Sequence, residues 1–128
     1  MQQTEKRKIV INNNQQEVYK FLKDPRNYLT GLNEVQVDNK GATFNVPMFG
    51  KIRADITNLI ENQKIVMYSK EINTSITVNL ENMGDSKTEV ELSVVSKPNC
   101  GLLKNMAISM AVPRLLNVVV ESFKERGI

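Results

Sequence analysis

The sequence predicts an α+β protein: a curved antiparallel β-sheet of about seven strands that grips one long C-terminal helix, with two short helices between strands 1 and 2. Two observations carry this prediction. Apolar and polar residues alternate repeatedly between residues 33 and 97, which is typical of strands with one buried and one wet face. The stretch from Cys100 to Arg126 is the only segment long and apolar enough for a full-length helix.

Size and composition predict a single domain over residues 1–128. A chain of 128 residues with 41% apolar and 24% charged residues has the balance of an ordinary globular domain. No secretory signal opens the chain, so we expect a cytoplasmic protein. The C-terminal segment carries charged residues and Pro113, without an uninterrupted run of about 18 apolar residues, so we expect no transmembrane span.

The side chains available for chemistry are few. The chain has no histidine and one cysteine, which removes the commonest general base and the commonest metal ligands. We therefore expect no metal and no cofactor, and a non-enzymatic role is favoured while catalysis stays open. The seven aromatic residues (three Tyr, four Phe) do not alternate with basic ones, so nucleic acid is not expected as a partner.

The N-terminal elements follow from local signals. Residues 4–11 alternate and predict the first strand. Asn14 followed by Glu17 has the spacing of a capping box and predicts a short helix over residues 15–23.

A second short helix is predicted directly after the first. Asp24 and Pro25 are a favoured pair for opening a helix, because Asp caps the N-terminus and Pro fits the first turn. This helix would carry Tyr28 and Leu29 and end near Gly31.

Six further strands are predicted between residues 33 and 97. Turns are expected at residues 39–41, 61–63 and 84–86, and Gly50 breaks the pattern once more. The residues expected on the buried face of these strands are Val35, Val37, Ala42, Phe44, Val46, Met48, Ile52, Ala54, Ile56, Met67, Ile72, Thr74, Ile76, Val78, Leu80, Thr88, Val90, Leu92 and Val94.

The long helix divides at Pro113, where a kink is expected. The half after it carries one amphipathic stripe (Val112, Leu115, Leu116, Val119, Val120 and Phe123) that should lie on the sheet. The half before it carries a stripe that points about 130° away: Leu102, Leu103, Met106 and Met110. Either this half is buried on several sides, or it lines a cavity, forms a mobile mouth or meets a partner.

The chain resembles the START-like helix-grip (SRPBCC) superfamily, which includes polyketide cyclase/dehydrase-like proteins. The resemblance covers nearly the whole chain and is carried by structural rather than catalytic motifs. These are Ile-Val-Ile-Asn at 9–12, Glu-Val-Tyr-Lys-Phe-Leu at 17–22, Asp24-Pro25, Gly-Lys-Ile-Arg-Ala-Asp at 50–55, Thr-Glu-Val-Glu-Leu at 88–92 and the final helix. Within the superfamily the chain is similar to the small carbon monoxide dehydrogenase subunit of this fold, although it lacks the glycine-rich segment of those proteins.

The resemblance implies a seven-stranded sheet around the long helix, with an apolar cavity between them that takes hydrophobic molecules. The leading hypothesis is therefore binding of a hydrophobic small molecule or lipid, since an empty cavity would be costly. The candidate ligand-binding residues are Phe44, Val46, Met48, Ile52, Ala54, Met67, Tyr68, Thr74, Ile76, Val78, Leu92, Leu103, Met106 and Met110.

Two alternatives stay open. A cyclase-like enzyme would need ionisable groups in the cavity, but Arg53 and Asp55 alternate with apolar neighbours and should lie on the wet face, which leaves Tyr68 as the best candidate. An interaction or assembly factor similar to the carbon monoxide dehydrogenase protein would expose an apolar patch on the first half of the helix, and a homodimer would bury that patch.

Overall fold

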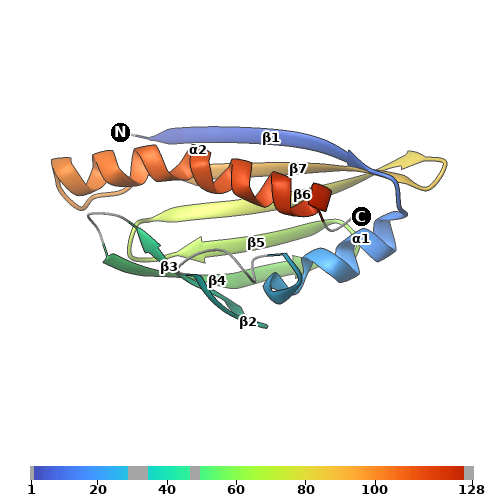
Figure 1. The fold of residues 1–128 in the computed structure, drawn as a ribbon, viewed down its shortest axis with the longest axis horizontal. Coiled ribbons are helices and arrows are strands. Elements are labelled where there is room, and N and C mark those ends of the chain that lie inside the picture. The colour runs from blue at the N-terminus through green and yellow to red at the C-terminus, as the bar shows by residue number, and fades with distance from the viewer. Residues whose placement is uncertain (1, 29–34, 47–49, 126–128) are drawn as a thin grey trace.

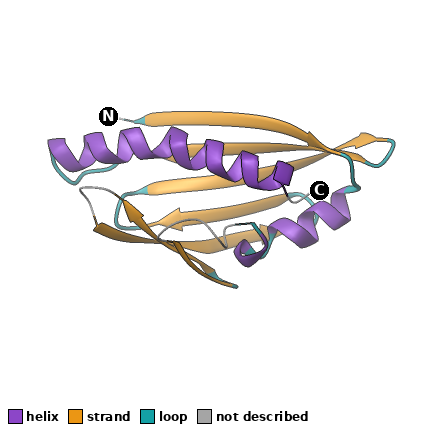
Figure 2. Cartoon of the chain, viewed as in Figure 1, coloured by secondary structure: helices purple, strands orange, loops and turns teal. Residues whose placement is uncertain are grey.

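The computed structural model describes residues 2–28, 35–46 and 50–125. Seven strands and three helical segments follow one another in the order β1, α1, η1, β2 to β7, α2 (Figures 1 and 2). Their bounds are β1 Gln3–Ile11, α1 Gln15–Leu22, η1 Pro25–Asn27, β2 Val35–Asp38, β3 Gly41–Val46, β4 Gly50–Ile60, β5 Lys64–Ser69, β6 Thr74–Gly84, β7 Lys87–Ser96 and α2 Leu102–Glu125.

The seven strands form one antiparallel sheet in the order β1-β7-β6-β5-β4-β3-β2. Strands β2 to β7 form a meander of neighbouring hairpins, and β1 joins the far edge by pairing along its whole length with β7. Both the α+β class and the antiparallel sheet around a long helix are confirmed. Alternation predicts these strands because most of them have one covered face and one wet face.

The predicted turns are confirmed at residues 39–40, 61–63 and 85–86. Asn62, Asp85 and Ser86 all adopt positive φ angles, which tight turns require. One predicted strand residue lies outside its strand. Ile72 was expected on the buried face of a strand, but β6 begins at Thr74, because Asn73 has a φ of 44° and still belongs to the turn. Ile72 is nevertheless buried.

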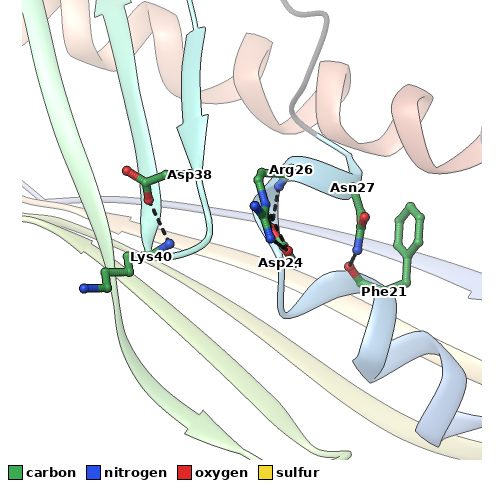
Figure 3. A network of polar contacts seen from close by, with 6 residues as sticks. All are labelled: Phe21, Asp24, Arg26, Asn27, Asp38 and Lys40. Atoms are coloured by element: carbon green, nitrogen blue, oxygen red, sulfur yellow. Dashed lines mark hydrogen bonds and ion pairs between the residues drawn. The ribbon is translucent and has the colours of Figure 1, made fainter.

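The two short helices are capped as the sequence predicts. The Asn14 side chain accepts the amide of Glu17 at 2.8 Å, and the Asp24 side chain accepts the amide of Arg26 at 3.0 Å. The second helix is shorter than expected. It is the single 3-10 turn η1, and Asn27 turns back to donate to the Phe21 carbonyl at 2.9 Å (Figure 3). The expected helical residues Leu29 to Gly31 lie outside the described residues.

The corner made by α1 and η1 is joined to the end of α2. Burial raises the pKa of the Tyr28 phenol, and its ring meets the Phe123 ring edge-on at a centroid distance of 5.3 Å. The Ser122 hydroxyl donates to the Tyr28 carbonyl at 2.6 Å. These contacts fix where α2 ends relative to η1. Figure 1 shows the last turn of α2 close to α1.

Helix α2 runs without interruption through Pro113. Its buried stripe spans both halves, because Ile108 and Val112 lie on the same face as Leu116, Val119 and Phe123. Burial of the first-half stripe on several sides is therefore wrong. That half contributes Ile108 to the core, while Leu102, Leu103, Met106 and Met110 are exposed.

A side chain of β1 explains how the helix tolerates the proline. Pro113 has no N–H, so the carbonyl of Ser109, four residues earlier, lacks its intrahelical donor. The Gln3 side-chain amide donates to that carbonyl at 3.1 Å. A second hydrogen bond joins the same strand to the helix further along: Arg7 Nε donates to Asn117 Oδ1 at 3.1 Å.

Removal of the Gln3 amide tests this compensation. Gln3→Ala should lower the free energy of unfolding by about 1 kcal/mol, since the Ser109 carbonyl loses its donor. In a Pro113→Ala background, which restores the intrahelical N–H, Gln3→Ala should lower the free energy of unfolding by clearly less. Urea unfolding of the four variants measures this coupling. Gln2→Ala is the matched control, and equal losses in the two backgrounds would refute the compensation.

Candidate functional site

A row of small side chains crosses the inner face of the sheet, the face that α2 covers. Ala42 pairs with Ala54, Ser69 with Thr74, and Thr74 with Ser96. Ala54 and Ser69 lie at the same level of adjacent strands, because their neighbours Asp55 and Tyr68 are paired. All five row residues are buried. The row therefore joins five strands at one level and leaves more room above the sheet than larger side chains would.

The three hydroxyls of this row are not equally satisfied. Thr74 Oγ1 donates to the Ile72 carbonyl at 3.0 Å and lies 2.7 Å from Ser96 Oγ. Because Thr74 has one hydroxyl hydrogen, Ser96 must be the donor in that second contact. Ser69 Oγ is buried and has no hydrogen-bond partner among the described residues. A buried hydroxyl left unpaired costs about 1–3 kcal/mol.

Most of the predicted ligand-binding residues lie on this inner face. They lie in the row or next to it, on the same side of strands β3 to β7. Those that are buried or half-buried there are Phe44, Ile52, Ala54, Met67, Thr74, Ile76, Val78 and Leu92. Ile76 is half-buried although both of its cross-strand neighbours, Met67 and Val94, are buried. The structure thus gathers these eight residues, of which Ala54 and Thr74 belong to the row, on one largely apolar surface.

Four predicted residues lie elsewhere. Tyr68 was expected to face the cavity, but it lies on the outer face because it alternates with the buried Met67 and Ser69. Its hydroxyl donates to Asn73 Oδ1 at 2.9 Å. Leu103, Met106 and Met110 do not face the sheet either, since the stripe through Ile108 takes that side of α2. Met48 and the side chain of Val46 lie outside the described residues.

A cavity of about 240 Å³ lies at the corner of the sheet formed by β2, β3 and β4. It is lined by Val35, Gln36, Thr43, Phe44, Asn45 and Lys51. Four of these six, Gln36, Thr43, Asn45 and Lys51, alternate onto the outer face. This hollow is therefore on the outside of the sheet and does not belong to the space between sheet and helix.

The ionisable residues considered for catalysis also lie on the outer face, as predicted for Arg53 and Asp55. Arg53 Nε donates to Asp55 Oδ1 at 2.8 Å, and Arg53 Nη2 donates to Asp38 Oδ1 at 3.1 Å. The hydrogen bond from Arg53, assisted by the Lys40 backbone amide, lowers the pKa of Asp38 from 3.8 to about 2. Figure 3 shows Asp38 and Lys40 at the β2–β3 turn. This cluster joins strands β2 and β4 across β3.

The Asp38 carboxylate gives a pH test of this cluster. Its pKa is lowered on folding, so its stabilising effect is present above about pH 4 and is lost as the pH falls towards 2. NMR titration of the Asp38 carboxyl should show a midpoint near 2 that rises towards 3.8 in Arg53→Gln. Arg7→Gln, on another strand, should leave the midpoint unchanged. A midpoint that is the same in wild type and Arg53→Gln would contradict the attribution of the lowered pKa to Arg53.

Sequence reasoning missed Ser69 and Ser96. Both are in phase with apolar residues of their strands, at the i+2 position after Met67 and Val94. A serine at the end of an alternating strand is also typical of the start of a loop. The available signal for its burial was therefore its position in the alternation, in step with the apolar residues. Thr74 and Thr88 were predicted at such positions, and Thr88 also bonds to backbone, donating to the Asn13 carbonyl at 2.8 Å.

Two further chemical features bear on the site. Among the described residues no three His, Cys, Asp or Glu side chains are grouped as metal ligands. One helix, Leu102–Lys124, is long and apolar enough to cross a membrane by length and composition, with a mean hydropathy of 1.4. Core helices of soluble proteins pass the same test, and this helix packs Ile108, Val112 and Leu116 on the sheet.

Solved structures with this fold are numerous. A START superfamily protein from Mycobacterium smegmatis shares 10% identity over 97% of this chain and 96% of its own, with a TM-score of 0.71. XoxI from Bacillus cereus shares 10% identity over 97% and 94%, with a TM-score of 0.68. The Aha1 dimer from Colwellia psychrerythraea shares 15% identity over 91% and 92%, with a TM-score of 0.58.

The chain therefore has the START-like helix-grip fold, as its sequence motifs predicted. No protein-family model matches the sequence, and no curated protein matches it. The narrower similarity to the carbon monoxide dehydrogenase protein stays a prediction.

Proposed function

We propose that this protein binds a hydrophobic small molecule or lipid between the sheet and α2, with a polar group of the ligand at Ser69. The observation that carries the proposal is the buried Ser69 hydroxyl, which has no partner among the described residues. Buried hydroxyls are almost always hydrogen-bonded, so an unpaired one marks a place where a further polar atom belongs.

The surroundings of Ser69 define the ligand that fits. Ala54 beside it is small, and the next level of the inner face carries Met67 and Ile76. The apolar part of the ligand would lie on these side chains. It would cover the part of Ile76 that is exposed in the free protein. A serine hydroxyl both donates and accepts, so the polar group at Ser69 is a carboxylate, carbonyl or hydroxyl oxygen.

Native mass spectrometry of freshly purified protein, followed by organic extraction, tests the function itself. The proposal expects a mass surplus that disappears on denaturation and an extractable amphiphile. Protein that carries no surplus and fails to bind a dansyl-labelled long-chain fatty acid would contradict the proposal, because that probe combines the required apolar body and terminal oxygen.

Ser69→Ala separates the effect on binding from the effect on folding. In the free protein the change removes an unpaired buried hydroxyl, so the free energy of unfolding should stay equal or rise by up to about 1 kcal/mol. Affinity for the dansyl fatty acid should fall roughly threefold to tenfold, the value of one hydrogen bond.

The matched control is Ser93→Ala, a serine on the outer face of β7. It should change neither the affinity nor, by more than about 0.5 kcal/mol, the stability. If Ser69→Ala destabilises the free protein and leaves the affinity unchanged, Ser69 has a structural partner and does not contact ligand.

A further inference from the structure

We propose that the exposed apolar side of the first half of α2 docks onto the surface of an anionic lipid bilayer. This surface consists of Leu102, Leu103, Met106 and Met110 and is called the outer apolar face below. The inference does not rest on the ligand proposed for the interior, because none of these four side chains faces the sheet.

The exposure of these side chains is unusual for their type. Leu102, Leu103 and Met110 are 77%, 67% and 71% exposed, more than any other large apolar side chain among the described residues, and Met106 is 53% exposed. Leu103, Met106 and Met110 follow the i, i+3, i+7 spacing of one helix face. Contiguous apolar patches of this kind mark interaction sites, whereas isolated exposed leucines do not.

The position of the outer apolar face leaves it accessible to a large flat partner. Figure 1 shows the first turns of α2 extending past the end of β1 and the neighbouring strands. A protruding helix end can reach a membrane surface without obstruction from the sheet. Amphipathic helices that bind in this manner lay their apolar side about 5–10 Å into the interface between headgroups and acyl chains.

The charges that this part of the chain itself carries have one sign. No Asp or Glu occurs between residues 92 and 120, while Lys97, Lys104 and Arg114 do. All three cationic side chains are exposed, and Arg114 follows Met110 by one turn on the same side of α2. Apolar side chains surrounded by cations complement a bilayer whose surface carries negative lipid headgroups.

Two carboxylates of the described residues at this end of the molecule are engaged with backbone or with a cation. Glu71 lies by the start of α2, since its carbonyl accepts the Cys100 thiol at 3.5 Å, and its carboxylate accepts the Arg53 amide at 2.9 Å. Glu5 pairs with Arg7 at 3.4 Å. Neither of these interactions involves Lys97 or Arg114, which are exposed before and within α2.

A bilayer fits this face better than a second copy of the chain. In a symmetric dimer the same cations of both protomers would approach one another, and like charges across an interface are costly. A stable dimer also buries about 800 Å² per partner, more than the few hundred Å² that four side chains offer. A spanning helix is not required either, because Ile108 and Val112 keep the opposite side of α2 on the sheet.

Vesicle co-sedimentation of the full chain tests the proposal. Wild-type protein should bind vesicles of phosphatidylcholine mixed with phosphatidylglycerol and should bind pure phosphatidylcholine far more weakly. The double variant Leu103→Asn/Met110→Asn should lose at least tenfold in partitioning to the anionic vesicles. Lys97→Gln/Lys104→Gln should lose roughly fivefold for each lysine removed, and added salt should reproduce that loss.

The matched control replaces two exposed apolar side chains elsewhere, Leu59→Asn/Met83→Asn, and should bind anionic vesicles as wild type does. Circular dichroism checks that every variant is folded. Equal loss in the control, or full binding by Leu103→Asn/Met110→Asn, would overturn the proposal. The proposal would also be overturned if the wild-type chain binds neither type of vesicle and instead forms a dimer that Leu103→Asn/Met110→Asn dissociates.

Discussion

The contact between one face of α2 and the inner face of the sheet is the constraint on which the rest of this structure depends. A seven-stranded sheet with an apolar inner face must be covered, and among the described elements α2 is the one long enough to run along it. The stripe from Ile108 to Phe123 meets this need with one side of the helix. The other sides of α2 are not needed to cover the sheet and can contact solvent or a partner.

Polar contacts fix the rotation of the helix about its axis and its position along the sheet. An apolar stripe alone would allow the helix to rotate and slide. Gln3 bonds to the carbonyl that Pro113 leaves open, Arg7 reaches Asn117, and Ser122 bonds to the chain after η1. Hydrogen bonds have a definite geometry, whereas burial of apolar area is nondirectional. The exposure of Leu103 and Met110 follows from this fixed rotation.

The strands and the helix could be predicted from the sequence because their patterns report burial directly. Alternation identified the inner faces of β3 to β7, and the angle between the two stripes of α2 correctly separated Met110 from Leu116. The stripe before Pro113 could not be assigned to solvent, because period alone does not say which side of a helix faces the sheet.

The candidate site was predicted less completely than the fold. Its apolar surface follows from alternation, but Tyr68 was placed inside although its strand phase puts it outside. Ser69 could not be recognised, because the significance of its hydroxyl depends on the partners that other strands supply. Pairing between distant residues such as Gln3 and Ser109 is a property of the folded chain and has no local signal.

Thiol accessibility along α2 tests the two-sided helix most directly. In a Cys100→Ser background, single cysteines at positions 106, 108, 110 and 112 report the orientation of each helix side, since Ile108 and Met110 lie about 160° apart. Met106→Cys and Met110→Cys should react with a maleimide at the rate of a free thiol, and Ile108→Cys and Val112→Cys at least a hundredfold more slowly. Equal rates at the four positions, or protection of positions 106 and 110 in the monomer, would contradict this orientation of the helix.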